Sequence, residues 1–184
     1  RTEHGSVKVE TLQELGSCRL GDNCGRPIWP KKITRGMDGM ILGESEGGMP
    51  QVDCEFDVMK GEIYTDQSFG AQGDQEMDYE KLISERPEYF VFNGAVGART
   101  KTHPLRASVG ETVRIYFGVG APNFTSSFHL IGEILDHVYQ SGGLSSPPLA
   151  GVQTATIPRG GGTGCSGRPA HGGGPRRGLR WARQ

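Results

Sequence analysis

His129 is the residue of this 184-residue chain whose type and place best suit it to chemistry. It lies in the apolar run FHLIGEI, and a histidine ring can both donate and accept a proton near neutral pH. From the pattern alone, a single His in an apolar strand is more often a core residue with satisfied hydrogen bonds. His137, beside Asp136, indicates an exposed strand end, and His103, before Pro104, indicates a loop.

The cysteines form no recognisable zinc site and no disulfide framework. Cys18, Cys24, Cys54 and Cys165 contain no CxxC pair and have no regular spacing. Cys24 is followed by a Pro-containing loop that reaches Met37. Taken by themselves, this thiol and this thioether are interpreted either as packing residues of a loop or as a site of weak metal affinity.

The elements that must position His129 are strands. Short β-branched and aromatic runs at Phe90 to Phe92, Val113 to Phe117 and Phe128 to Ile134 are separated by Gly, Pro and Asn, which predicts a sheet sandwich. His129 falls inside the last predicted strand. Alternation over Val52 to Met59 predicts a half-buried strand that continues over Gly61 to Thr65, and Val152 to Ile157 predicts a further one.

The chain divides into three parts at the level of sequence. Residues 1–48 are expected to be the end of a first domain, in which 1–22 are poorly periodic apart from a possible strand at Ser6 to Glu10, and Met40 to Leu42 forms a last strand. Residues 43–50 are a Gly- and Glu-rich linker, and residues 49–160 form a second, incomplete domain. A helix is expected at Asp78 to Glu85, stopped before Pro87.

Residues 161–184 differ in composition from the rest of the chain. They hold eight Gly and five Arg, no acid and little that could be buried, which predicts a disordered tail. An Arg/Gly segment that binds nucleic acid is the functional alternative, but Trp181 is its one aromatic residue for stacking on bases. We therefore expect no nucleic-acid partner.

The overall composition agrees with a turn-rich β protein. The chain has 30 Gly, 11 Pro and 34% hydrophobic residues, and its formal net charge of -1 gives no attraction to nucleic acid or anionic membranes. No apolar run approaches the roughly 20 residues of a membrane span. The start lacks an initiator Met and an apolar signal core, so we expect an internal piece of a longer chain.

Three segments carry a resemblance to a known family. FVFNGAVGA, VGETVRIYFGVGAPNFTSSFHLIGEILDHVY and VQTATIP, in this order, resemble the second domain of copper-containing, nitric-oxide-forming nitrite reductases, which belong to the cupredoxin and multicopper oxidase superfamily. The resemblance implies an all-β fold of Greek-key cupredoxin β-sandwiches, of which this partial chain holds the end of a first domain and most of a second.

The resemblance also implies a function. The family reduces nitrite to nitric oxide with one electron and two protons, in the periplasm, as a homotrimer fed by a cupredoxin or a c-type cytochrome. Its SSFH-x-IGEI pattern matches here at His129 and Ile131. His129 would then donate protons and orient the substrate, and Ile131 would wall the pocket.

Family members hold a type 1 and a type 2 copper. The type 1 pattern Cys-x7-His-x4-Met places Cys24 and Met37 at ligand positions, but Lys32 stands at the histidine position. An ammonium group cannot ligate a metal until it loses its proton. Asn23 stands where the family has a His ligand to the catalytic copper, and an amide is a poor replacement for imidazole. The alternative function is therefore a catalytically inactive cupredoxin-like structural or interaction module.

Overall fold

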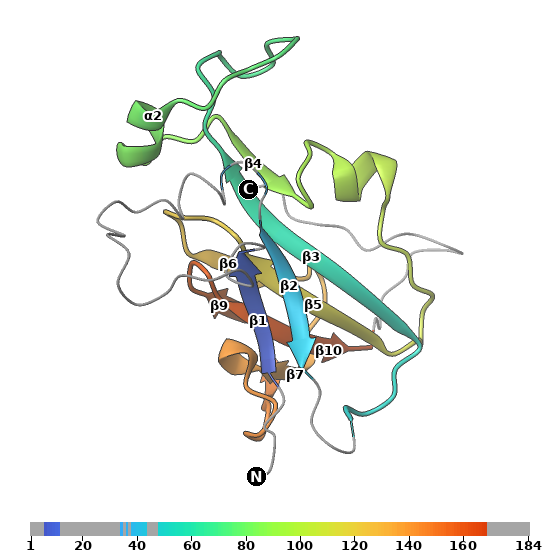
Figure 1. Ribbon diagram of the computed structural model, residues 1–184. Helices are drawn as coiled ribbons and strands as arrows, with labels where there is room; N and C mark the ends of the chain where they lie inside the picture. Colours follow the sequence, from blue (N-terminus) through green and yellow to red (C-terminus); the bar gives the residue numbers. More distant parts are fainter. Residues whose placement is uncertain (1–5, 12–33, 35, 37, 44–47, 169–184) are drawn as a thin grey trace, which may run out of the picture.

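The computed structural model describes residues 6–11, 34, 36, 38–43 and 48–168 (Figure 1). Most of these residues form strands that run through three sheets. In chain order the elements are β1 (Ser6–Thr11), β2 (Asp38–Gly43), β3 (Cys54–Ile63), α2 (Tyr79–Ile83), β4 (Tyr89–Phe92), π-helix η1 (Ala98–Thr102), β5 (Val113–Val119), β6 (Ser126–His129), β7 (Leu135–Tyr139), 3-10 helix η2 (Gln140–Gly142), β8 (Leu149–Val152), β9 (Thr154–Ile157) and β10 (Gly162–Gly167).

The large sheet has six strands in the order β4-β3-β5-β10-β7-β8. Strands β3 and β5 are parallel, and the other neighbours in this sheet are antiparallel. Strands β6 and β9 form a second, two-stranded sheet, and β1 pairs with β2 in a third. The prediction of an all-β sandwich is confirmed.

The core lies between the large sheet and the β6–β9 sheet. Strand β5 is buried along its whole length, because it lies inside the large sheet and carries large apolar side chains. The Phe117 ring on this strand lies 4.7 Å from the Phe128 ring of β6 and 6.3 Å from the Phe92 ring of β4, measured between ring centroids. The contact with Phe128 joins the two sheets, whereas the contact with Phe92 lies within the large sheet.

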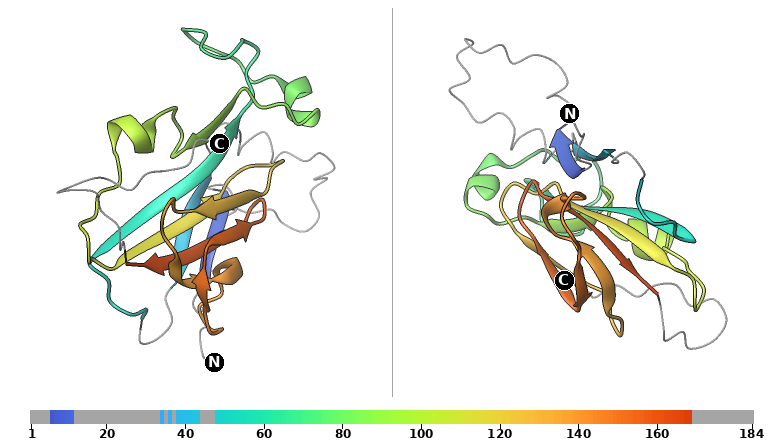
Figure 2. Two further views of the ribbon diagram at one scale, coloured as in Figure 1. Left: turned by 180° about the vertical axis from the view of Figure 1, so that it is seen from behind. Right: turned by 90° about the horizontal axis from the view of Figure 1, so that it is seen from below.

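The hairpin β1–β2 covers one face of the large sheet, where β1 contacts β5 and β10 (Figures 1 and 2). Both of its strands were predicted. One close approach is at Gly120, where an added Cβ atom would lie 1.8 Å from the Asp38 carboxylate. The hairpin therefore fits against the sheet because residue 120 has no side chain.

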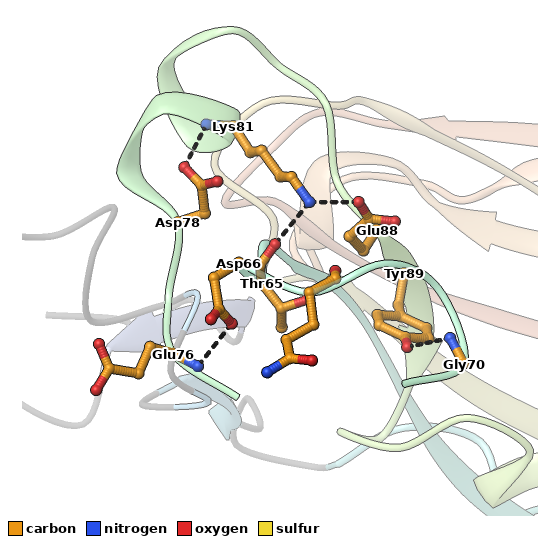
Figure 3. A network of polar contacts seen from close by, with 9 residues as sticks. Thr65, Asp66, Gly70, Glu76, Asp78, Lys81, Glu88 and Tyr89 are labelled. Atoms are coloured by element: carbon orange, nitrogen blue, oxygen red, sulfur yellow. Dashed lines mark hydrogen bonds and ion pairs between the residues drawn. The ribbon is translucent and has the colours of Figure 1, made fainter. Parts of the chain in front are cut away.

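Residues 64–88 project from the end of the large sheet between β3 and β4 (Figure 1). The predicted helix is present as the single turn α2, capped by Asp78, whose side chain accepts from the Lys81 backbone N–H. Lys81 Nζ donates to the Thr65 carbonyl oxygen at 2.7 Å and forms an ion pair with Glu88 (Figure 3). Together with the bond from the Gly70 N–H to the Tyr89 hydroxyl, these contacts tie the projecting segment together.

Two predicted strands are each divided in the structure. The run Phe128 to Ile134 is not one strand, since β6 ends at His129 and β7 begins at Leu135. Gly132 lies between them with a φ of 81°, a conformation that turns the chain and favours glycine. The run Val152 to Ile157 is also divided, because β8 ends at Val152 in the large sheet and β9 pairs with β6.

The predicted disordered tail is wrong for residues 162–167, which form β10 between β5 and β7. This strand is buried because its backbone pairs on both sides, which needs no large apolar side chain. Thr163 and Cys165 are 2% and 1% exposed, and the Thr163 hydroxyl donates to the Tyr139 carbonyl oxygen at 2.8 Å. Residues 169–184 lie outside the described part of the chain.

Candidate functional site

His129 is the last residue of β6, and its ring is held by a backbone group of the neighbouring strand region. Its Nδ1 atom lies 2.8 Å from the carbonyl oxygen of Gln153, the residue between β8 and β9. A carbonyl oxygen can only accept, so Nδ1 carries the proton and donates it. In the neutral ring Nε2 then has a free lone pair, and in the charged ring it has a second N–H to give.

The sheet register explains why the ring meets this carbonyl. His129 pairs with Thr154, the first residue of β9, so the carbonyl of the preceding Gln153 lies beside the end of β6. Phe128 is 3% exposed and packs in the core, whereas His129 is half-buried at the margin. Alternation along the strand thus anchors β6 through Phe128 and leaves the imidazole at the boundary with solvent.

Ile131 lies in the turn that follows β6. It is 54% exposed, and Ile134 in the same turn is 60% exposed, whereas Leu130 between β6 and the turn is buried. The Glu133 N–H closes this turn by donating to the Leu130 carbonyl oxygen at 3.2 Å. The turn therefore presents two apolar side chains, Ile131 and Ile134, to solvent near the end of β6.

The predicted copper residues are not placed by the structure. Cys24, Met37, Lys32 and Asn23 lie outside the described residues. Among the residues that are described, no three His, Cys, Asp or Glu side chains gather in a group that could hold a metal ion. His129 alone does not make a copper site. The donors described here do not fit a copper ion by themselves.

A buried polar cluster near the start of β6 was not anticipated from the sequence. The Glu62 carboxylate accepts the Tyr64 hydroxyl at 2.6 Å and the backbone N–H groups of Asn123 and Phe124 at 3.3 and 2.9 Å. Burial raises the pKa of Glu62, and these hydrogen bonds offset part of that rise. A Glu in an alternating strand ordinarily indicates a solvent-facing position, so no local signal marks it.

The charged side chains Lys60 and Arg114 are also buried, at 3% and 4% exposure. The ammonium group of Lys60 lies 4.9 Å from the centroid of the Phe90 ring, and burial lowers the pKa of this lysine. Arg114 Nη1 forms an ion pair with Glu55 at 2.5 Å. Each buried cation thus has a partner.

Comparisons with known proteins agree on one family. Over 129 residues the chain is 50% identical to the copper-containing nitrite reductase of Neisseria meningitidis serogroup A, which covers 70% of this chain and 33% of that protein. It is 35% identical over 154 residues to the copper-containing nitrite reductase of Alcaligenes faecalis, covering 75% of this chain and 40% of that protein. The chain thus spans about a third of the length of the curated relatives that it matches most strongly.

Solved structures give the same answer for the fold. The copper nitrite reductase from Nitrosomonas europaea superposes with a TM-score of 0.65 at 25% identity, over 90% of this chain and 65% of that chain. A multicopper oxidase superposes with a TM-score of 0.62 at 17% identity, which shows the fold alone. The cupredoxin sandwich is confirmed. No protein-family model matches the chain, and among the described residues no helix is long and apolar enough to cross a membrane.

Proposed function

Since this chain is a homologue of the copper-containing nitrite reductases, we propose that it is part of an enzyme that reduces nitrite to nitric oxide. Nitrite takes up one electron and two protons, one N–O bond breaks, and nitric oxide and water leave. We further propose that His129 delivers protons and that Ile131 walls the nitrite pocket. The observation that supports this role is the Nδ1 contact of His129 with the Gln153 carbonyl oxygen.

That contact supports separate tasks for the two ring nitrogens of His129 in this proposal. Nδ1–H stays bonded to the carbonyl oxygen in both charge states, so the ring keeps its orientation while it reacts. Nε2–H of the charged ring is then the proton that can be given to an oxygen of nitrite. After transfer the ring is neutral, with the tautomer that the carbonyl already favours.

We infer copper as the cofactor from the homology to copper-containing nitrite reductases. Bound copper would supply the electron, and Cys24 and Met37 are the candidate type 1 ligands, although Lys32 and Asn23 stand at family histidine positions. The described residues form no copper site of their own. We also propose, by homology, a homotrimer in the periplasm that receives its electron from a cupredoxin or a c-type cytochrome.

The test of the His129 role is a substitution in the full-length reductase. His129→Ala should lower turnover about 10²- to 10⁴-fold, because a positioned general acid contributes about that factor. His137→Ala is the matched control, since His137 is exposed on β7, and it should leave turnover near that of the parent. Unchanged turnover in His129→Ala at equal copper content would refute the assignment.

The second candidate function, a cupredoxin-like module without catalysis, is favoured by Lys32 and Asn23. Reconstitution of the chain with copper distinguishes the two candidates. An intense visible thiolate-to-copper band near stoichiometric metal supports an electron-transfer site at Cys24 and Met37. No band and no bound copper supports the inactive module.

A further inference from the structure

The loop of residues 120–125, which connects β5 to β6, is bound to β3 at two points. At its beginning the Gly120 N–H donates to the Lys60 carbonyl oxygen at 2.9 Å. In its middle the successive N–H groups of Asn123 and Phe124 donate to the Glu62 carboxylate. Two adjacent backbone N–H groups aimed at one anion form a small anion-binding concavity. Strand β3 therefore fixes both the beginning and the middle of the loop.

The Glu62 carboxylate is buried, and the loop is its main partner. Glu62 is 2% exposed and also accepts the Tyr64 hydroxyl at 2.6 Å. The Asn123 side-chain Nδ2 donates to the Tyr64 hydroxyl oxygen and to the Leu82 carbonyl oxygen, each at 2.8 Å. Hydrogen bonds to a buried carboxylate are strong, and removing the carboxylate leaves its buried donors unsatisfied. The loop has little freedom to move while the carboxylate is present.

Strand β6 follows directly on this loop. Within the described residues β6 pairs only with β9, and neither strand belongs to the large sheet. Two of the contacts that join β6 to the large sheet are the packing of Phe128 on Phe117 and the loop that Glu62 holds. A further connection runs through its partner β9, which continues from β8 by way of Gln153. The packing of Phe128 on Phe117 is apolar and has little directionality, whereas the hydrogen bonds that hold the loop are directional.

We propose that Glu62 is a positioning residue for His129, because it anchors the loop that sets where β6 lies on the large sheet. This inference rests on the proposed function of His129. Loss of this anchor would lower the reaction rate, since a displacement of about 1 Å in a reacting group can cost about 10²-fold in rate. Glu62 does not contact the substrate in this proposal, and it acts only through the loop and strand β6.

The test uses Glu62→Gln in the full-length reductase. The amide keeps the size of the side chain but replaces an acceptor oxygen by a donor, so at least one loop N–H or the Tyr64 hydroxyl loses its partner. We expect kcat to fall by about 10- to 100-fold at unchanged copper content. We also expect the limb of the pH–rate profile that belongs to His129 to move, because its contact with the Gln153 carbonyl changes.

Val58→Ala is the control for a merely structural effect. Val58 lies on the same strand, is fully buried in the core and takes no part in the cluster. Its loss should lower the melting temperature without moving the pH–rate profile or kcat. If Glu62→Gln does not fold, Glu62→Asp keeps the charge but withdraws it by one methylene, and its kcat should lie between the parent and the Gln value.

Crystal structures of the parent and of the folded Glu62 variant separate this inference from the proposed function. The inference predicts that loop 120–125 and His129 move together relative to β5. A variant in which His129 keeps its place, or in which kcat and the pH–rate profile match those of Val58→Ala, would overturn it. Unchanged turnover in His129→Ala would instead overturn the proposed function, whatever the variant structures show.

Discussion

Gly120→Ala tests the docking of the hairpin β1–β2 on the large sheet. The added Cβ atom would lie 1.8 Å from Asp38 Oδ2, 2.8 Å from Asp38 Cγ and 2.6 Å from the Met59 methyl carbon. The Met59 methyl group can rotate away, whereas the Asp38 carboxylate must change its rotamer or β2 must shift to make room. Asp38 is partly buried, and this burial raises the pKa of its carboxyl group to about 6. Overpacking of this kind costs about 1–3 kcal/mol.

The measurement is urea unfolding at pH 7 followed by circular dichroism, for the parent, Gly120→Ala, Asp38→Ala and the double variant. If the Asp38 carboxylate is the obstacle, Gly120→Ala should lower the free energy of unfolding by about 1–3 kcal/mol in the parent. In the Asp38→Ala background the cost should fall below about 0.5 kcal/mol, since the two sites are coupled. An equal cost in both backgrounds, or a negligible cost in the parent, would refute this account of the contact.

Two further predictions concern β10. A chain that ends at Gly161 loses six residue pairs with β5 and three with β7; at about 1 kcal/mol per hydrogen bond this approaches the roughly 5–15 kcal/mol of a whole domain. It should show no cooperative thermal transition by circular dichroism, whereas a chain that ends at Arg168 should show one, and equal transitions would contradict us. Burial raises the pKa of the Cys165 thiol to about 12, so between pH 7 and 9 its thiolate is scarce and iodoacetamide should label it only after denaturation. Peptide mass spectrometry measures this, and labelling of the native chain as fast as that of the unfolded chain would count against burial.

The strands that carry their own signal were predictable from the sequence. Alternation marked β3, a β-branched and aromatic run marked β5, and the helical spacing of apolar residues before Pro87 marked α2. Strand β10 could not be found this way, because Gly, Thr and Ser carry no apolar pattern and its burial comes from the strands on either side. The sequence also did not show that the run from Phe128 to Ile134 is interrupted, because the positive φ of Gly132 that turns the chain is visible only in the structure.

The candidate site shows the same limit. His129 could be singled out from its residue type and its motif, but Gln153 could not, because it acts through a backbone carbonyl that any residue would supply. Glu62 was also missed, since its partners at Asn123 and Phe124 lie about sixty positions further along the chain. The sequence could therefore indicate which side chain is suited to proton transfer, but it could not indicate that side chain's backbone hydrogen-bond partner or the buried contacts between residues far apart in the chain.

The order in which the large sheet can assemble follows from the place of its last strand. Strand β10 is made after every other strand described here, yet it is the strand that joins β4-β3-β5 to β7-β8. Before β10 is made, the edges of β5 and β7 that face each other in the finished sheet have no strand between them. The β5 edge belongs to the apolar run VRIYFGV, the kind of edge on which chains aggregate. The six-stranded sheet can therefore close only when residues 162–167, the last described strand in the chain, have been made.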